Sequence, residues 1–107
     1  MTMDAVFKAL ADGGRRALLD SLRERGGQTL GELCAGREMT RQAVSKHLAV
    51  LEAASLIATE KRGREKLHYL NPVPIQEIAD RWIGQYERGR LAALADLKRR
   101  LEGDTDG

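Results

Sequence analysis

The chain has 107 residues, the size of one small domain, and its 42% hydrophobic content argues against a disordered chain. Its one cysteine excludes an intrachain disulfide, and no apolar run reaches the roughly 18 residues of a membrane helix. The N-terminal stretch also lacks a basic region ahead of an apolar block. We therefore expect a cytoplasmic protein that does not contact a membrane.

The charge of the chain is unevenly distributed. A net charge of +2 does not by itself indicate a nucleic-acid partner. Residues 37–66, however, hold seven basic and four acidic side chains. This middle stretch therefore carries the positive excess of the chain, and it is where a contact with a polyanion is expected.

Two short helices are predicted at the N-terminal end. The spacing of Phe7 and Leu10 places both side chains on one face of a helix over residues 4–11. Asp12 then stands where an N-cap belongs. A second helix with a leucine stripe follows it and ends at the glycine pair 26–27.

A helix-turn-helix unit is predicted next. Thr29 and Glu32 have the spacing of a capping box at the start of a third helix. After a short turn, Thr40 is placed to cap a fourth helix that runs to about Ala54. A short helix, a turn and a second amphipathic helix form the order of a helix-turn-helix.

Beyond this unit the hydrophobic period changes to that of strands. Residues 56–62 and 66–71 are two extended runs separated by Gly63 and polar neighbours, which predicts a charged β-hairpin. In the helix-turn-helix context this hairpin is a candidate wing that lies along DNA phosphates. The predicted phosphate contacts of the wing are Lys61, Arg62, Arg64 and Lys66.

The last part of the chain predicts one long helix. From residue 75 to residue 101 apolar side chains recur every three or four positions, with an interruption at Gly89 and Arg90. Short helices and a hairpin cannot cover all of this stripe, so we expect the first and last helices to pair with a second subunit. The predicted dimer contacts are Phe7, Ile78, Trp82, Tyr86, Leu94 and Leu97.

Together these elements predict the fold class. It is mainly α with a small β-hairpin, a winged helix-turn-helix with a long C-terminal dimerisation helix. We expect a single domain over residues 1–102, with dimerisation helices at about 4–11 and 75–101, and a disordered tail over 103–107.

The fourth predicted helix has two different faces. At about 100° per residue, Val44, Leu48 and Leu51 share the inner face. The opposite face is polar in its N-terminal half and carries Ala49 and Ala53 further along, where short side chains leave clearance for a partner. Donors and acceptors of this kind reach base edges and phosphates in a major groove. The predicted DNA contacts on this helix are Thr40, Arg41, Gln42, Ser45 and Lys46.

Four stretches of the sequence resemble the ArsR-type winged helix-turn-helix transcriptional repressors, in the same order. They are ALADGGRRALL, LGELC, TRQAVSKHLAVLEAASLI and KRGREKLHYL, and they span roughly residues 5–71. The resemblance implies a bacterial or archaeal repressor that binds an operator as a homodimer and that an effector, often a metal ion, releases. It also suggests a DNA contact for His47, with a packed, hydrogen-bonded histidine as the alternative.

The sequence departs from the family's pattern at two places. Cys34 fits the first position of the Cys-x-Cys pair of arsenite-sensing members, but Gly36 replaces the second. One cysteine and two histidines are too few for a four-ligand site of nitrogen and sulfur in one subunit. We therefore expect no metal and no other cofactor. Gly13 and Gly14 stand where the family has proline and a hydroxyl residue, which predicts a looser helix start.

The sequence thus predicts a sequence-specific transcriptional regulator, a repressor whose effector is unknown. A two-fold dimer would present its recognition helices about 34–36 Å apart, which predicts an inverted-repeat operator. No phosphate loop, nucleophile motif or catalytic carboxylate arrangement is found, so we expect no enzyme. Two alternatives stay open, a dimeric protein-interaction module without DNA binding and a repressor switched by the thiol of Cys34.

Overall fold

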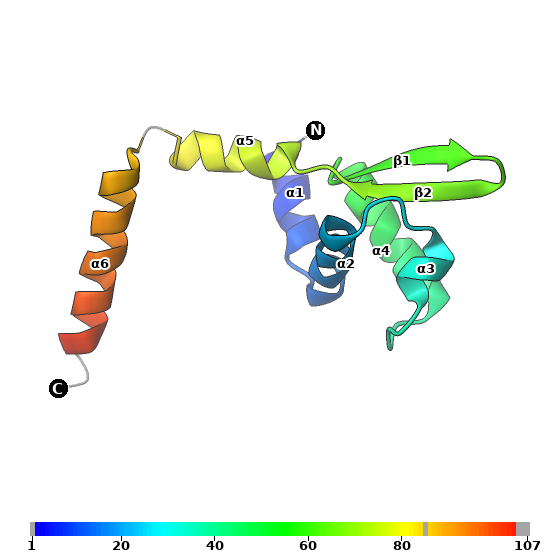
Figure 1. Cartoon of the computed structure of the whole chain (residues 1–107), viewed down its shortest axis with the longest axis horizontal. Coiled ribbons are helices and arrows are strands. Elements are labelled where there is room, and N and C mark those ends of the chain that lie inside the picture. Colours follow the sequence, from blue (N-terminus) through cyan, green and yellow to red (C-terminus); the bar gives the residue numbers. More distant parts are fainter. Residues whose placement is uncertain (1, 85, 105–107) are drawn as a thin grey trace.

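The computed structural model describes residues 2–84 and 86–104 (Figure 1). Within these ranges the chain forms helices and a two-stranded antiparallel sheet, so the predicted fold class is confirmed. In chain order the elements are α1 (Met3–Leu10), α2 (Gly13–Glu24), α3 (Leu30–Cys34), α4 (Arg41–Ala53), β1 (Ile57–Arg62), β2 (Glu65–Leu70), α5 (Val73–Trp82) and α6 (Arg88–Asp104).

Polar side chains fix where α2, α3 and α4 begin. Asp12 accepts a hydrogen bond of 3.0 Å from the Arg15 N–H at the start of α2. Thr29 and Glu32 form the complete capping box of α3, and Thr40 caps α4. All three caps agree with the sequence prediction. Each one satisfies a backbone N–H that has no partner within its own helix.

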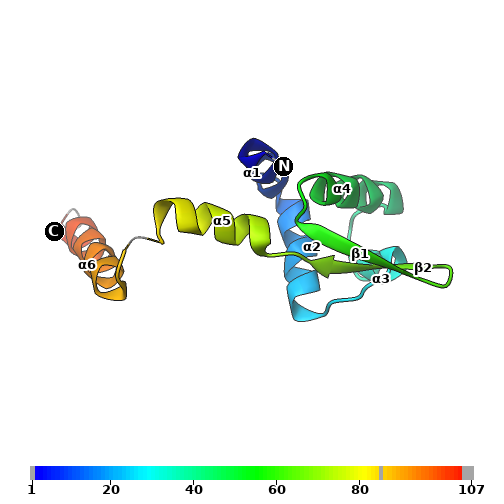
Figure 2. The ribbon, with the colours of Figure 1, turned by 90° about the horizontal axis from the view of Figure 1, so that it is seen from above.

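One core joins α1 to α4 and the base of the hairpin. The inner face of α4, formed by Val44, Leu48 and Leu51, is at most 4% exposed, as predicted from its periodicity. Figure 2 shows α5 leaving this body on one side and the hairpin projecting on the other. The other core side chains are Val6, Ala9, Leu18, Leu19, Leu22, Leu33, Ala54, Leu56 and Ile57.

A short bridge ties β2 to the loop that precedes α3. Gln28 and His68 pair as an antiparallel bridge, with the His68 N–H 2.8 Å from the Gln28 carbonyl oxygen. The His68 Nδ1 atom lies 2.8 Å from the same oxygen. The Gln28 side-chain amide donates to the carbonyl oxygens of Ser21 and Arg25. Because both Gln28 and His68 are buried, this network fixes the base of the hairpin against α2.

The prediction of a single helix over residues 75–101 is wrong, because this part of the chain forms two helices, α5 and α6. α5 ends at Trp82, and α6 begins at Arg88. At Gly84 an added Cβ would lie 2.9 Å from the carbonyl oxygen of Asp80, so the tight turn after α5 requires glycine. Glycine also has a low helix propensity. The interruption predicted at Gly89 and Arg90 falls inside α6.

The ends of this C-terminal region also differ from the prediction. α5 begins at Val73, since Pro72 is its N-cap and Pro74 stands in its first turn, where a missing N–H breaks no helical hydrogen bond. α6 extends to Asp104, so residues 103 and 104 are helical rather than part of a disordered tail. Residues 105–107 lie outside the described residues.

The first turn of α2 generates a stability prediction. A Cβ added at Gly14 would lie 3.0 Å from Asp12 Oδ2 and 3.2 Å from both His47 Nε2 and Met39 Sδ, whereas at Gly13 the nearest atom is 3.6 Å away. Gly14→Ala should lower the free energy of unfolding by about 1–2 kcal/mol, because the new methyl group displaces the N-cap carboxylate. Urea titration followed by circular dichroism measures the change.

Gly13→Ala is the matched control for this substitution. It should leave the free energy of unfolding unchanged or raise it by up to about 1 kcal/mol, since alanine favours the helix. Equal destabilisation by the two substitutions would contradict the crowding argument at Gly14.

Candidate nucleic-acid interface

The outward face of α4 is open to solvent along its whole length. Arg41, Gln42, Ser45 and Lys46 are all exposed, on the side opposite the buried core face. Thr40, also exposed, accepts a hydrogen bond from the Ala43 N–H, so its hydroxyl holds the helix start. The predicted reading side chains therefore lie together on the first two turns of one helix.

An open groove of about 580 Å³ lies between α4, the start of α3 and the hairpin. Arg41, Ser45 and Ala49 line it from α4, and the short side chain of Ala49 leaves the groove wide at this point. Arg64 and Lys66 line it from the hairpin. Donors and cations thus face one another across a groove, as contact with both the bases and the backbone of a duplex requires.

The four cations of the hairpin differ in their surroundings. Lys66 Nζ lies 3.1 Å from Glu52 Oε1 on α4. Arg62 Nη2 lies 3.6 Å from Glu60 Oε1 on its own strand. By contrast, Lys61 and Arg64 have no ion pair with any residue that the structure describes. Two of the four predicted phosphate contacts are therefore partly neutralised within the protein, and two present free charges.

Arg64 occupies the tip of the hairpin. β1 ends at Arg62 and β2 begins at Glu65, so Gly63 and Arg64 form the two-residue turn. Gly63 has φ of +63°, a left-handed conformation that favours glycine and suits a tight hairpin turn. The turn places the Arg64 side chain at the far end of the hairpin and beside the groove.

His47 faces the body of the protein and not the open groove. Its Nε2 atom lies 3.8 Å from Asp12 Oδ2, and its Nδ1 atom lies 3.4 Å from Arg15 Nη1. With the side chain 22% exposed, this is the packed arrangement that the sequence left open as an alternative. The hydrogen bond from the Arg15 N–H lowers the pKa of Asp12, and the charges of His47 and Arg15 lower it further. A DNA contact by His47 stays a prediction.

Arg15 and Arg16 have a role that the sequence analysis did not identify. Arg15 Nε donates to the Ala9 carbonyl oxygen at 2.8 Å, and Arg16 Nη1 donates to the Leu10 carbonyl oxygen at 2.7 Å. Both guanidinium groups thus satisfy carbonyl groups at the C-terminal end of α1. The available signal was the position of two arginines directly after a predicted helix end.

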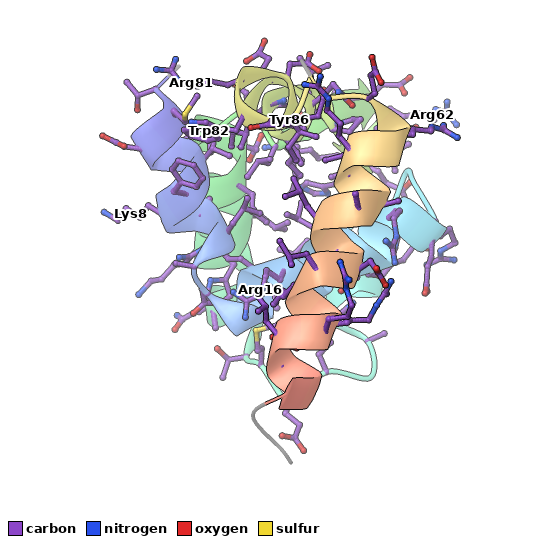
Figure 3. The ribbon with its side chains drawn as sticks, turned by 90° about the vertical axis from the view of Figure 1, so that its left-hand side faces the viewer. Lys8, Arg16, Arg62, Arg81, Trp82 and Tyr86 are labelled. Atoms are coloured by element: carbon purple, nitrogen blue, oxygen red, sulfur yellow. The ribbon has the colours of Figure 1, made fainter. Side chains whose placement is uncertain are left out.

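The predicted dimer residues fall into two groups. The rings of Phe7 and Trp82 stack with centroids 6.2 Å apart, and both side chains are about half exposed. Ile78 instead packs partly buried against the core of its own chain. Figure 3 shows the side of the molecule that carries Trp82 and Tyr86. The remaining exposed side chains of the predicted set are Tyr86, Leu94 and Leu97.

The family resemblance implies that a metal ion is a frequent effector, and such an ion would need a cluster of ligating side chains. Within residues 2–84 and 86–104, no group of three or more His, Cys, Asp and Glu side chains is arranged to hold a metal ion. Cys34 lies partly buried against the core. In the same described part of the chain, no helix is long and apolar enough to cross a membrane.

Known proteins share this architecture. A helix-turn-helix domain family matches residues 10–60. YuzN, an uncharacterized HTH-type transcriptional regulator of Bacillus subtilis, is 41% identical over 86 residues, which cover 75% of this chain and 94% of that protein. The arsenical resistance operon repressor of Escherichia coli is 31% identical over 104 residues, covering 94% and 89% of the two chains. The structure of an ArsR-like transcriptional regulator from Rhodococcus sp. RHA1 superposes with a TM-score of 0.67 at 28% identity, covering 97% and 90%.

The matched region contains the helices that build one side of the groove. Residues 10–60 include all of α2, α3 and α4 and the first part of β1. The E. coli relative extends the similarity over nearly the whole chain. The chain therefore belongs to the ArsR-type winged helix-turn-helix transcriptional regulators, which are DNA-binding proteins.

Proposed function

We propose that the protein is a cytoplasmic repressor that binds an inverted-repeat operator as a homodimer. The observation that carries this proposal is the groove between α4 and the hairpin, which exposes donors on one wall and, on the other, the cation of Arg64, unpaired within the described residues, beside Lys66. An α-helix fits the major groove of B-DNA, and its N-terminal residues then reach the base edges. Repression agrees with the similarity to the arsenical resistance operon repressor of E. coli.

The side chains divide into two tasks. Gln42 and Ser45 read base edges from the first turns of α4, while Arg41 and Lys46 beside them contact bases or phosphates. On the wing, which is the β1–β2 hairpin, Arg64 has no ion pair with any described residue, so its cation is available to a phosphate. The other proposed contacts are Thr40 and His47 on the helix side, and Lys61, Arg62 and Lys66 on the wing.

The exposed surface of the chain supports the homodimer. Its accessible surface is 7820 Å², about 1,900 Å² more than the roughly 5,900 Å² that a compact monomer of its mass exposes. Obligate homodimers bury about 1,000–2,500 Å² per subunit, which is the size of this excess. A two-fold dimer then presents two α4 helices to successive major grooves and requires an inverted repeat. Because residues 2–84 and 86–104 hold no group of three or more His, Cys, Asp and Glu side chains arranged around a metal, the proposed effector is not a metal ion held by these residues of one subunit.

Selection of duplexes from a random DNA pool tests the proposal. We expect an inverted repeat to emerge and to bind at least about 10³-fold more tightly than random duplex at physiological salt. Affinity is measured by gel shift for the selected duplex, and again for a matched duplex in which one half-site is scrambled. Equal affinity for selected and random DNA would instead favour the dimeric interaction module.

Gln42→Ala should relax specificity at one base position. Loss of a base contact weakens the binding free energy by roughly 1–3 kcal/mol for operators with the preferred base and by little for operators with another base at that position. Competition binding with operators that vary at single positions measures the change. Gln76→Ala is the control, because Gln76 is exposed on α5 and bonds to Asp80. A uniform loss of affinity for all sequences would show that Gln42 does not read a base.

Arg64→Gln should lower the salt dependence of binding. Each neutralised phosphate contributes about 0.9 to the slope of log K against log salt, so the loss is about one unit per subunit. Lys66→Gln is the matched comparison, and we expect a smaller change in slope because Glu52 already neutralises Lys66. An unaltered slope for Arg64→Gln would count against a phosphate contact by the wing tip.

A further inference from the structure

Three cations of the wing surround one hollow. The hollow has a volume of about 340 Å³ and is lined by Lys61, Arg64 and Lys66, together with Thr59 and Glu65. Lys61 and Lys66 are directly opposite each other in the pairing of β1 with β2. Like charges at opposite positions of two strands destabilise a sheet. The wing therefore gathers positive charge against its own stability, which indicates a site for an anion such as a DNA phosphate.

Lys66 stands between this hollow and the groove that faces α4, since its side chain lines both. In the groove, Lys66 Nζ lies 3.1 Å from Glu52 Oε1 and 3.3 Å from Glu52 Oε2. Both oxygens of one carboxylate thus face a single ammonium group. The side chains of Lys66 and Glu52 are nevertheless 54% and 32% exposed, so another anion can reach the ammonium group.

Glu52 lies within the surface that is proposed to face DNA. Ser45, Ala49 and Glu52 follow one another by about one turn on the same face of α4, and all three line the groove. Because Ser45 is a proposed base contact, a duplex in the groove brings its phosphates close to the Glu52 carboxylate. A carboxylate is repelled by a polyanion. A face adapted only for tight binding would carry a neutral or basic residue at this position.

The ion pair is weak enough for a DNA phosphate to replace it. An exposed pair of this kind changes an equilibrium by roughly fivefold at most. A duplex presents one negative charge per about 1.7 Å of its axis, and a cation that binds it releases counterions. Lys66 can therefore exchange Glu52 for a phosphate when DNA enters the groove. Each exchange still loses the contact with Glu52, so the ion pair opposes the binding of DNA.

We propose that Glu52 competes with DNA phosphates for Lys66 and thereby limits the affinity of the protein for any duplex. In the free protein Glu52 withdraws Lys66 from the hollow that Lys61 and Arg64 line. Binding to random DNA consists almost entirely of phosphate contacts, whereas operator binding also uses base contacts. The competition therefore removes a larger share of the binding free energy from random DNA. This inference rests on the DNA binding of the proposed function and adds to it a residue that limits binding outside the operator.

Glu52→Gln tests the competition, because it removes the charge and keeps the size of the side chain. Binding to a random duplex is measured by fluorescence anisotropy at a series of salt concentrations. The substitution should raise the affinity by about tenfold at low salt. It should also steepen the slope of log K against log salt by up to about 0.9 per subunit, since the released Lys66 neutralises a phosphate. Unchanged affinity and slope would overturn the proposal.

Glu65→Gln is the matched control. Glu65 lines the same groove and the same hollow, but it has no ion pair with any residue that the structure describes. Removal of its charge should raise the affinity less than Glu52→Gln does and should leave the slope unchanged, because no cation is released. Equal changes in slope for the two substitutions would indicate general repulsion of DNA and would contradict the competition.

A double-mutant cycle with Lys66→Gln shows whether Glu52 acts through Lys66. In the Lys66→Gln background, Glu52→Gln should no longer steepen the slope, since the cation that it would release is absent. A gain of the same size in both backgrounds would mean that Glu52 repels DNA directly, and the proposal would be wrong. Circular dichroism of each variant should show an unchanged fold, because the pair is exposed.

The random duplex keeps this test separate from the identity of the operator. If the unsubstituted protein bound no duplex at all, both the proposed function and the competition would be overturned. If it bound DNA and Glu52→Gln brought no gain, the competition alone would be overturned.

Discussion

The burial of one face of α4 is the constraint on which the proposed interface depends. Val44, Leu48 and Leu51 are held in the core against α1 and α2, and burial of each such side chain contributes about 1.5–3 kcal/mol. A rotation of α4 by one residue position turns the helix by about 100° and would expose this face. The cost of that exposure fixes the orientation of the opposite face. Gln42 and Ser45 therefore point away from the protein for reasons of packing alone.

The wing obtains its position from a separate set of contacts. The bridge between Gln28 and His68 anchors β2 to the loop between α2 and α3, at buried side chains where hydrogen bonds are strong. The Lys66–Glu52 ion pair joins the wing to α4 on the exposed side, where such pairs contribute at most about 1 kcal/mol. The buried bridge is thus the firmer support. The exposed ion pair mainly changes how much charge the wing offers to a phosphate.

The apolar stripe of α6 is unfavourable in water unless something covers it. α6 has no buried face within its own chain, since residues 88–103 are all exposed. Its leucines have the spacing of a buried face, and hydrophobic surface of this extent is unfavourable in water. In the proposed dimer the same surface that destabilises a single chain becomes the interface.

The sequence by itself determined the elements whose signals are local. The caps at Asp12, Thr29 and Thr40 and the two faces of α4 follow from neighbouring residues, because capping and helical periodicity act within a few positions. The resemblance to the ArsR-type regulators likewise rests on contiguous stretches, so the family and the candidate reading helix could be predicted from the sequence.

Only the tertiary structure decided how distant residues combine. The pairing of Lys66 with Glu52, and the placement of His47 between Asp12 and Arg15, join parts of the chain that no local pattern connects. The sequence predicted no break after α5, because the apolar stripe continues through it. Periodicity indicates which residues share a face, but it does not indicate whether the helix axis changes direction. The turn after α5, where Gly84 lies close to the Asp80 carbonyl oxygen, changes that axis, and only the tertiary structure shows that the rest of the chain leaves α6 exposed.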